Sequence, residues 1–312
     1  MYTINLKINK LLSIWLISMF FIIALMIVVG GLTRLTDSGL SITEWQLFSG
    51  ILPPLNNDQW IMYFNLYKEI PEFKLQNFNM SLQEFKIIFW WEWAHRFLGR
   101  LIGIGFIIPL IYFTIILGFK KLFNLYLIFI LICFQGFLGW FMVQSGLVYD
   151  VDVSHFRLSA HLLFAFIILS LIFWNYLKTK VKINLKNTIN LIFPLGFLFL
   201  IFLQIIIGAF VSGMDAGKIY NSWPLMGSSF FPDDNDYSNL FKLSAFSDPS
   251  LVQFIHRKLA YLIGFIYLYL LFKIYKKKMT SLYKSINIVG ILIFLQIILG
   301  IFTLFFFLKI LI

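Results

Sequence analysis

Seven long apolar segments constrain the fold of this chain more than any other feature. A helix needs about 20 mostly apolar residues to cross the hydrocarbon core of a bilayer. Hydrophobic residues make up 60% of the sequence and charged residues only 12%, which is too little charge to cover a soluble domain of this size. We therefore predict an all-α integral membrane protein. The predicted spans are residues 11–30, 90–118, 122–145, 157–177, 188–212, 252–272 and 286–310.

Many of the lysines lie on one side of the predicted membrane. The segment before the first span, and those linking spans two and three, four and five, and six and seven, contain no Asp or Glu; the 14 acids of the chain lie elsewhere. Short lysine-rich segments stay in the cytoplasm, so we predict a cytoplasmic N-terminus. The net charge of +11 then reflects topology, and we predict no nucleic-acid partner. The lysines are Lys7, Lys10, Lys120, Lys121, Lys178, Lys180, Lys182, Lys186, Lys273, Lys276, Lys277, Lys278 and Lys284.

The single cysteine, Cys133, lies in the third predicted span. One intramembrane cysteine cannot form an internal disulfide, so we expect a small hydrophobic core residue at this position. Redox chemistry based on a pair of thiols is therefore not expected.

The chain contains an internal repeat. One constant shift aligns positions in the two long outer loops without a gap, and a second, shorter shift aligns the helices that follow. We interpret this as a tandem duplication of a four-helix transmembrane bundle, with units at residues 1–187 and 188–312. Seven spans are present, and the eighth is expected to be missing because the counterpart of His161 falls beyond Ile312. The aligned pairs include Gly30/Gly208, Asp37/Asp215, Trp45/Trp223, His95/His256, Arg96/Arg257, Gln135/Gln296 and Gly139/Gly300.

Four histidines, His95, His155, His161 and His256, lie at or near the outer ends of spans two, four and six. Ionisable groups at membrane depth are costly and are usually retained for function. Imidazole can bind haem iron from either face, so we predict that His95 and His161 flank one haem and that His256 ligates another. Zinc fits less well, because a structural zinc site needs four ligands. The alternative is that each histidine bonds only to backbone or water at the interface.

His155 differs from the other three. It precedes His161 by six residues, so the two side chains cannot share a helix face. We expect His155 in the outer loop, near the edge of the haem.

Glu92 lies one turn before His95, on nearly the same helix face. Its repeat counterpart is Gln253, which cannot ionise. This difference predicts that one unit performs chemistry, with Glu92 as the catalytic residue, while the other holds a cofactor. The alternative is an interfacial acid paired with Arg96 or Arg100.

Arginine is rare in this lysine-rich chain, and each arginine lies close to an outer helix end. The planar guanidinium binds carboxylates through two hydrogen bonds, so haem propionates are candidate partners. Snorkelling of these side chains to the interface is an equal alternative. The candidates for propionate or haem-edge contacts are Arg34, Arg96, Arg157 and Arg257, together with His155.

Two other features favour structural roles. Gln135 and Gly139, like their counterparts Gln296 and Gly300, are spaced to share one helix face, and we favour close helix packing for them. The outer-loop segments 36–41 and 214–218 are expected to form turns over the helix ends.

Five segments of the chain form one signature: GGLTRLTDSGLSITEW (30–45), EWAHRFLGR (92–100), FRLSAHL (156–162), GMDAGKIYNSWPLM (213–226) and QFIHRKLAY (253–261). With these segments the chain resembles the haem A synthase family, in its cysteine-free bacterial type, over residues 20–308. The resemblance implies an oxidoreductase that converts the C8 methyl group of haem O to a formyl group by successive hydroxylation. It further implies that His95 and His161 flank haem O, that Glu92 assists the chemistry, and that His256 ligates a haem b cofactor.

The expected partners are haem O, haem O synthase, an unidentified electron donor and membrane lipid, and a homo-oligomer is left open. With no presequence character, a bacterial inner membrane is the expected location. Two other functions remain open at this point. One is a di-haem b-type cytochrome that transfers electrons, and the other is a non-catalytic haem-handling or oxidase-assembly protein.

Overall fold

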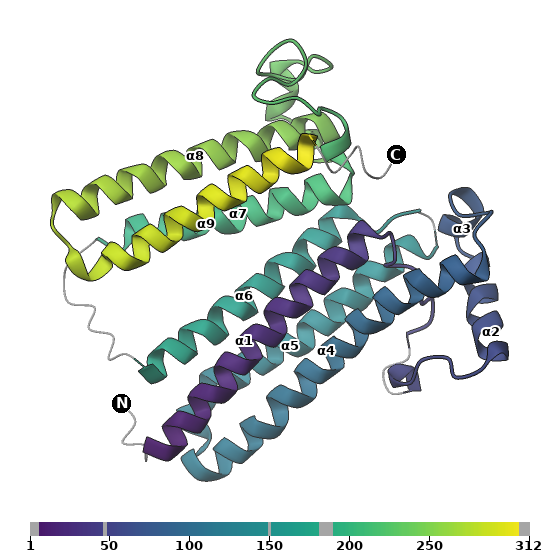
Figure 1. Cartoon of the computed structure of the whole chain (residues 1–312), viewed down its shortest axis with the longest axis horizontal. Helices are drawn as coiled ribbons and strands as arrows, with labels where there is room; N and C mark the ends of the chain where they lie inside the picture. Colours follow the sequence, from purple (N-terminus) through teal and green to yellow (C-terminus); the bar gives the residue numbers. More distant parts are fainter. Residues whose placement is uncertain (1–5, 46–48, 149–150, 181–189, 306–312) are drawn as a thin grey trace. The chain divides into compact units, whose positions relative to one another are not determined.

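The computed structural model describes residues 6–45, 49–148, 151–180 and 190–305. Within these residues, seven helices are long and apolar enough to cross a membrane, and each corresponds to one predicted span (Figure 1). The prediction of an all-α integral membrane protein is confirmed. Predicted span residues 188–189 and 306–310 lie outside the described residues. The helices are α1 (Leu6–Leu35), α4 (Leu82–Leu117), α5 (Phe119–Gly146), α6 (His155–Lys180), α7 (Ile192–Gly213), α8 (Pro249–Lys276) and α9 (Thr280–Phe305).

Local sequence signals fix the ends of several helices. Ser81 and Glu84 form a capping box at the start of α4, in which each side chain bonds the backbone N–H of the other. Asp248 caps α8 by accepting from the backbone N–H of Leu251 at 3.0 Å. Between α4 and α5 only Gly118 is non-helical, with a left-handed φ of 83° that favours glycine. Lys120, which was expected in a linking loop, therefore lies in the first turn of α5.

The first compact unit comprises residues 1–183. Its four long helices form a closed ring, in which α1 packs on α4, α4 on α5, α5 on α6, and α6 on α1. Consequently α4 and α6 lie on one diagonal of the bundle.

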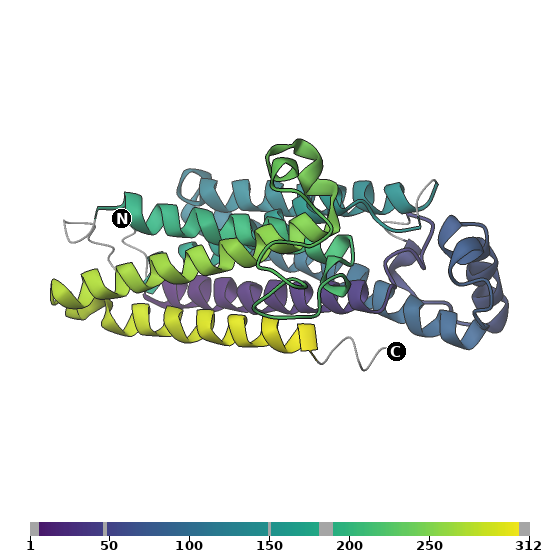
Figure 2. The same ribbon diagram turned by 90° about the horizontal axis from the view of Figure 1, so that it is seen from above.

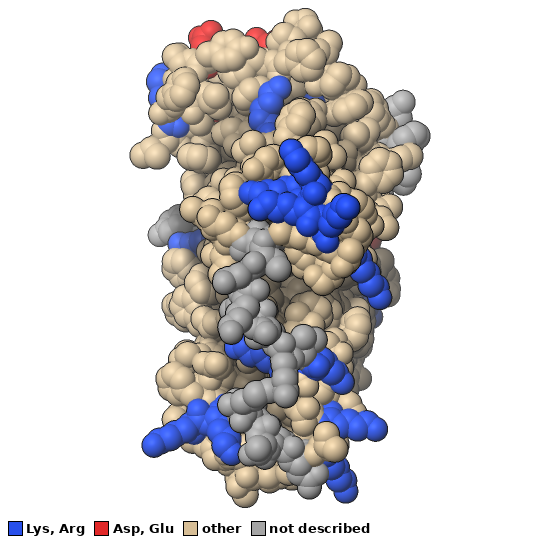
Figure 3. All heavy atoms as spheres, turned by 90° about the vertical axis from the view of Figure 1, so that its left-hand side faces the viewer, with Lys and Arg blue, Asp and Glu red and all other residues tan. Residues whose placement is uncertain are grey.

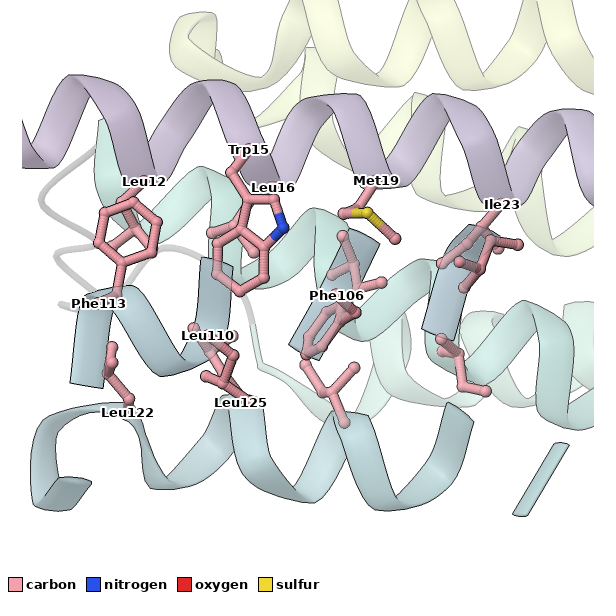
Figure 4. Close-up of a cluster of buried hydrophobic side chains, with 14 residues drawn as sticks. Leu12, Trp15, Leu16, Met19, Ile23, Phe106, Leu110, Phe113, Leu122 and Leu125 are labelled. Carbon is pink, nitrogen blue, oxygen red and sulfur yellow. The ribbon is translucent and has the colours of Figure 1, made fainter. Parts of the chain in front are cut away.

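Large apolar side chains fill the inner part of this ring. Figure 4 shows side chains of α1 pointing toward those of α4 and α5. Trp15 anchors the group: its ring lies 5.0 Å from that of Phe106, and its indole nitrogen donates to the carbonyl oxygen of Gly105 at 3.0 Å. In a bilayer, lipid is as apolar as these side chains, so close van der Waals packing and such hydrogen bonds hold the helices together.

Cys133 does not belong to this core. The expectation of a buried core residue is wrong, because the side chain is exposed on the outside of α5. A helix in lipid can present an apolar residue outward as readily as inward, so hydrophobicity alone does not predict its direction.

The outer loop after α1 contains two helices that were not predicted, α2 (Asn57–Lys68) and α3 (Pro71–Leu75). Asn56 caps α2 by accepting from the backbone N–H of Gln59 at 2.9 Å. Buried aromatic residues of α2, among them Trp60 and Tyr67, pack on the outer end of α4. A short 3₁₀ helix, η1 (Ser49–Ile51), precedes α2. This loop is therefore a small folded cap on the outer end of the bundle.

The second compact unit comprises residues 184–312. Helix α8 packs on both α7 and α9, and Figures 1 and 2 show α8 and α9 side by side. The outer loop of this unit contains three short 3₁₀ helices, η2 (Ala216–Lys218), η3 (Tyr237–Phe241) and η4 (Leu243–Ser247).

The backbone supports the internal repeat. Asp37 after α1 and Asp215 after α7 are aligned positions, and both adopt the left-handed conformation, with φ of 46° and 50°. An aspartate tolerates this conformation better than most residues. Both segments form the expected turns at the helix ends.

Within each unit, the described lysines of the short segments lie at the same end of the long helices. Figure 3 shows many Lys and Arg side chains and few Asp or Glu side chains. The distribution agrees with the charge asymmetry of the sequence.

Candidate functional site

His95 and His161 belong to the two helices on the diagonal of the first unit, α4 and α6. Each ring lies against a glycine of the neighbouring helix. A Cβ at Gly30 of α1 would be 2.8 Å from Cε1 of His95, and a Cβ at Gly139 of α5 would be 3.2 Å from Cε1 of His161. The structure thus makes room for both imidazoles at positions where any larger residue would collide with them.

His161 has a polar neighbour as well. The side-chain amide of Gln135 donates to the carbonyl oxygen of His161 at 2.8 Å, and its nitrogen lies 3.2 Å from the ring Nδ1. For His95, in contrast, the ring Nδ1 is buried and has no hydrogen-bond partner among the described residues.

His256 of α8 is held in a similar way in the second unit. A Cβ at Gly208 of α7 would be 3.1 Å from its Cε1. The amide nitrogen of Gln204 lies 3.2 Å from the ring Nε2 and donates to the carbonyl oxygen of His256 at 3.2 Å. Gln204 was not recognised in the sequence, because its repeat counterpart is Met26 and the two residues do not match.

Glu92 is buried, with 3% of its surface exposed, and hydrogen bonds reach both of its oxygens. Oε2 accepts from the Ser41 hydroxyl and from the backbone N–H of Ile42, each at 2.7 Å. Oε1 accepts from the guanidinium of Arg96 at 2.6 Å. The ion pair with Arg96 that was considered for this residue is therefore present, and it is joined by two contacts to the outer loop that the sequence did not indicate.

The counterpart of Glu92 makes the opposite kind of bond. Gln253 is buried and donates its side-chain amide to the carbonyl oxygen of Tyr220 at 3.0 Å. Tyr220 is the repeat counterpart of Ile42. At this position the first unit therefore presents an acceptor to the loop, and the second unit presents a donor.

Arg96 and Arg257 occupy equivalent positions and make equivalent contacts. Arg96 donates to the carbonyl oxygens of Ile42 at 2.7 Å and Glu44 at 3.1 Å. Arg257 donates to the matching carbonyl oxygens of Tyr220 at 2.9 Å and Ser222 at 2.8 Å. Each guanidinium ties an outer loop to the helix that carries a candidate haem ligand.

The other candidate residues at the outer ends also have protein partners. Arg34 pairs with Asp37 at 2.6 Å, and Arg157 donates to the carbonyl oxygen of Phe141 at 2.7 Å. His155 is the first residue of α6 rather than a loop residue, because the helix begins two residues before the predicted span. Its ring lies 4.1 Å from that of Phe156. The haem-edge roles of these residues stay predictions.

A second buried carboxyl lies in the cap formed by α2 and α3. Glu72 accepts from the Tyr67 hydroxyl at 3.1 Å and from the Asn77 amide at 3.3 Å, while its Oε2 is buried and has no partner among the described residues. Burial raises the pKa of Glu72 to about 8. Burial also raises the pKa of Tyr67.

The donor set suits haem better than a bare metal ion. In the part of the chain that the structure describes, no group of three or more His, Cys, Asp and Glu side chains is placed to hold an ion. The candidate ligands are instead single imidazoles on apolar helices, each with a glycine that makes room for the ring. A haem needs only one such ligand on each face.

The chain resembles a set of known proteins along most of its length. Residues 13–312 match the family model described as cytochrome oxidase assembly protein. A curated protein from Pelagibacter ubique (strain HTCC1062), named Heme A synthase, is 52% identical over 299 residues, which is 95% of this chain and 88% of the relative. Proteins of the same name from Rickettsia bellii (strain RML369-C) and Flavobacterium johnsoniae are 43% and 42% identical, and cover 95% and 96% of this chain and 90% of each relative. No solved structure matches the chain significantly.

Proposed function

Because the chain belongs to the family of cytochrome oxidase assembly proteins, we propose that it is an enzyme that converts haem O to haem A. In this reaction the C8 methyl group of haem O is oxidised to a formyl group. Two successive hydroxylations each oxidise that carbon by two electrons, and the resulting geminal diol loses water. Each of these oxidations needs an external oxidant: either dioxygen with two electrons from a donor, the second oxygen atom leaving as water, or a two-electron acceptor with water as the oxygen source. The expected redox partner is an electron donor, as the first of these routes requires.

The observation that carries this proposal is the pair of imidazoles on the diagonal helices α4 and α6. His95 and His161 are the residues that would bind the substrate haem from its two faces. The glycines beside the rings keep both positions open to imidazole. Apolar helices around them exclude water, which strengthens electrostatic interactions inside the site.

Glu92 contributes a carboxylate one turn from His95. Its three hydrogen bonds fix the position of the side chain, so that it acts on the site without reorganisation. The same bonds hold residues 41–44 over the outer end of α4. We assign Glu92 to assisting the oxidation, with Arg96 as the residue that orients it.

His256 is the residue that would hold a haem b cofactor in the second unit. Such a group supplies one-electron transfer when bound. Gln253, which cannot ionise, agrees with a role in cofactor binding rather than in oxidation of a substrate.

The protein is a multi-pass membrane protein, and we place its lysine-rich helix ends in the cytoplasm and the protein itself in a bacterial inner membrane. The candidate site then lies near the outer surface. Haem O synthase, as the source of the substrate, is the expected functional partner.

The test is to express the chain together with an enzyme that produces haem O, and to chromatograph the haems extracted from the membranes. Haem A or its hydroxylated intermediate is the expected product. The Glu92→Gln variant should retain bound haem and form no product, whereas the exposed residue Glu69 provides a control in Glu69→Gln. Bound haem without product in the unaltered chain would favour an electron-transferring cytochrome and contradict the proposal. Full activity of Glu92→Gln would remove the catalytic assignment.

A further inference from the structure

Two of the histidines lie in the same side-chain arrangement, which we call the amide cradle. It consists of a glutamine and a glycine four residues later on one helix, both in contact with a histidine of the adjacent helix. Gln135 and Gly139 of α5 form the cradle of His161. The second cradle, around His256, is formed by Gln204 and Gly208 of α7.

The two cradles are not copies of each other through the internal repeat. Gln135 lies on the third long helix of its unit and supports a histidine on the fourth, whereas Gln204 lies on the first helix and supports a histidine on the second. The same arrangement thus occurs at two unrelated positions. Packing explains the glycines, because a Cβ would approach each ring to 3.2 or 3.1 Å. It does not explain why a buried amide accompanies them.

In each cradle, the amide oxygen of the glutamine accepts no hydrogen bond from the described residues. In both cradles the amide nitrogen donates to the histidine carbonyl, while Oε1 of Gln135 and of Gln204 is buried without a partner among the described residues. An imidazole that binds a metal through one nitrogen carries a proton on the other, and that N–H needs an acceptor. The nearest ring nitrogen lies 3.2 Å from the amide in each case, and it is Nδ1 in His161 and Nε2 in His256. A half-turn of the amide about its last bond would present Oε1 to that nitrogen and give up the bond to the histidine carbonyl.

His95 lacks this support. Gly30 lies against its ring, but the residue four positions earlier is Met26. A thioether is only a weak acceptor, and Nδ1 of His95 is buried without a partner in the described part of the chain. Nδ1 of His256 is also buried without such a partner, but there the other ring nitrogen, Nε2, faces Gln204. Of the two imidazoles in the first unit, one has an amide beside it and the other has none.

We propose that Gln135 and Gln204 are positioning residues that fix the rotation of the His161 and His256 rings, and that Met26 leaves His95 as the more easily released ligand. The inference rests on the proposed function, in which these histidines bind haem. Hydrogen bonding to the second nitrogen makes an imidazole a stronger donor to iron and holds its plane. The substrate haem in the first unit therefore has one firmly held ligand and one that can leave.

The experiment uses the full chain with His256→Ala, so that bound haem reports on the first unit. Carbon monoxide binding to the reduced haem measures how readily an axial ligand leaves, and electron paramagnetic resonance of the oxidised haem reports the angle between the imidazole planes. Met26→Gln should weaken carbon monoxide binding about fivefold, the factor that one net hydrogen bond carries. Gln135→Leu should shift the largest g value, because the His161 ring is no longer held. It should change carbon monoxide binding less than Met26→Gln does, because carbon monoxide displaces His95.

Gln296→Leu is the matched control. Gln296 is the repeat counterpart of Gln135, but it is exposed and makes no hydrogen bond to any described residue, so both readouts should stay unchanged. Met26→Gln should weaken carbon monoxide binding, whereas partial unfolding would loosen the ligand and strengthen it, so the two causes give opposite signs. Unchanged readouts in both Met26→Gln and Gln135→Leu, with haem bound, would overturn the inference. If His95→Ala and His161→Ala leave the haem content and the spectra unaltered, the proposed function fails instead.

Discussion

The carboxylate of Glu92 accepts a hydrogen bond from the backbone N–H of Ile42 at 2.7 Å, across a sequence separation of 50 residues. Through this contact the outer loop is tied to the helix turn that precedes His95. The ion pair with Arg96 completes the arrangement. Glu92 therefore both holds the outer loop and belongs to the proposed catalytic site.

Replacing Glu92 with leucine should detach this loop. Glu92→Leu leaves the Ile42 N–H and the Arg96 guanidinium without their acceptor, at a cost of about 3 kcal/mol, as for other broken buried ion pairs. Glu92→Gln keeps one acceptor oxygen and should cost about 1 kcal/mol. Limited proteolysis between residues 41 and 56 in detergent measures the difference. Equal cleavage of the two variants would show that the loop does not depend on this carboxylate.

Gly139 should tolerate no side chain. In Gly139→Ala the new Cβ would lie 3.2 Å from Cε1 of His161 and push the ring aside, so we expect loss of most bound haem. Gly300→Ala is the matched control, because nothing among the described residues lies within 4 Å of the corresponding Cβ. Haem content per protein after purification is the measurement. Normal haem content in Gly139→Ala would argue against His161 as a ligand.

Arg257 should stabilise the outer loop of the second unit by its geometry and not only by its charge. Its guanidinium reaches the carbonyl oxygens of Tyr220 and Ser222 at once, which the single ammonium of lysine cannot reproduce. Arg257→Lys should lower the unfolding free energy by about 1–2 kcal/mol. Thermal unfolding in detergent tests this, with Lys218→Ala as a control at an exposed ion pair that should contribute little. A fall no larger than that of the control would contradict the assignment.

The cap formed by α2 and α3 should lose stability as the pH rises. The pKa of Glu72 is raised to about 8 in the folded state, so the folded form holds a proton that the unfolded form releases near its ordinary value of 4.5. The stability is complete below that value, declines between it and about 8, and is lost above. Glu72→Gln should remove this dependence and raise the melting temperature at pH 8.5 relative to the unaltered chain. Glu69→Gln, at an exposed site, should leave the pH profile unchanged.

The membrane helices were predictable because a bilayer demands long apolar segments, and the sequence has one for each of these helices. The repeat also aligns Arg96 with Arg257, and the two guanidinium groups donate to equivalent loop carbonyl oxygens. Helix α2 was missed, although Trp60, Phe64 and Tyr67 recur at helical spacing. A short amphipathic helix lacks the continuous apolar run that marks a membrane-spanning helix.

The surroundings of the site were harder to predict. Ser41 and Ile42 bond Glu92 from a loop far away in the sequence, and no local pattern reveals such a contact. The role of Gln204 could not be inferred from the repeat, because the residue at the equivalent position of the first unit is Met26. The direction of Cys133 could not be inferred because both faces of a spanning helix are apolar.

Gly118 alone separates α4 from α5. A connection this short joins the end of α4 to the start of α5 in a tight hairpin, so we expect the two helices to move together. A turn of α4 about its axis, which would re-aim His95, must also turn or strain α5 and thereby shift Gln135 beside His161. We therefore expect rotations of α4 and α5 to be coupled across the proposed haem pocket. Lengthening the link by a few flexible residues should uncouple them.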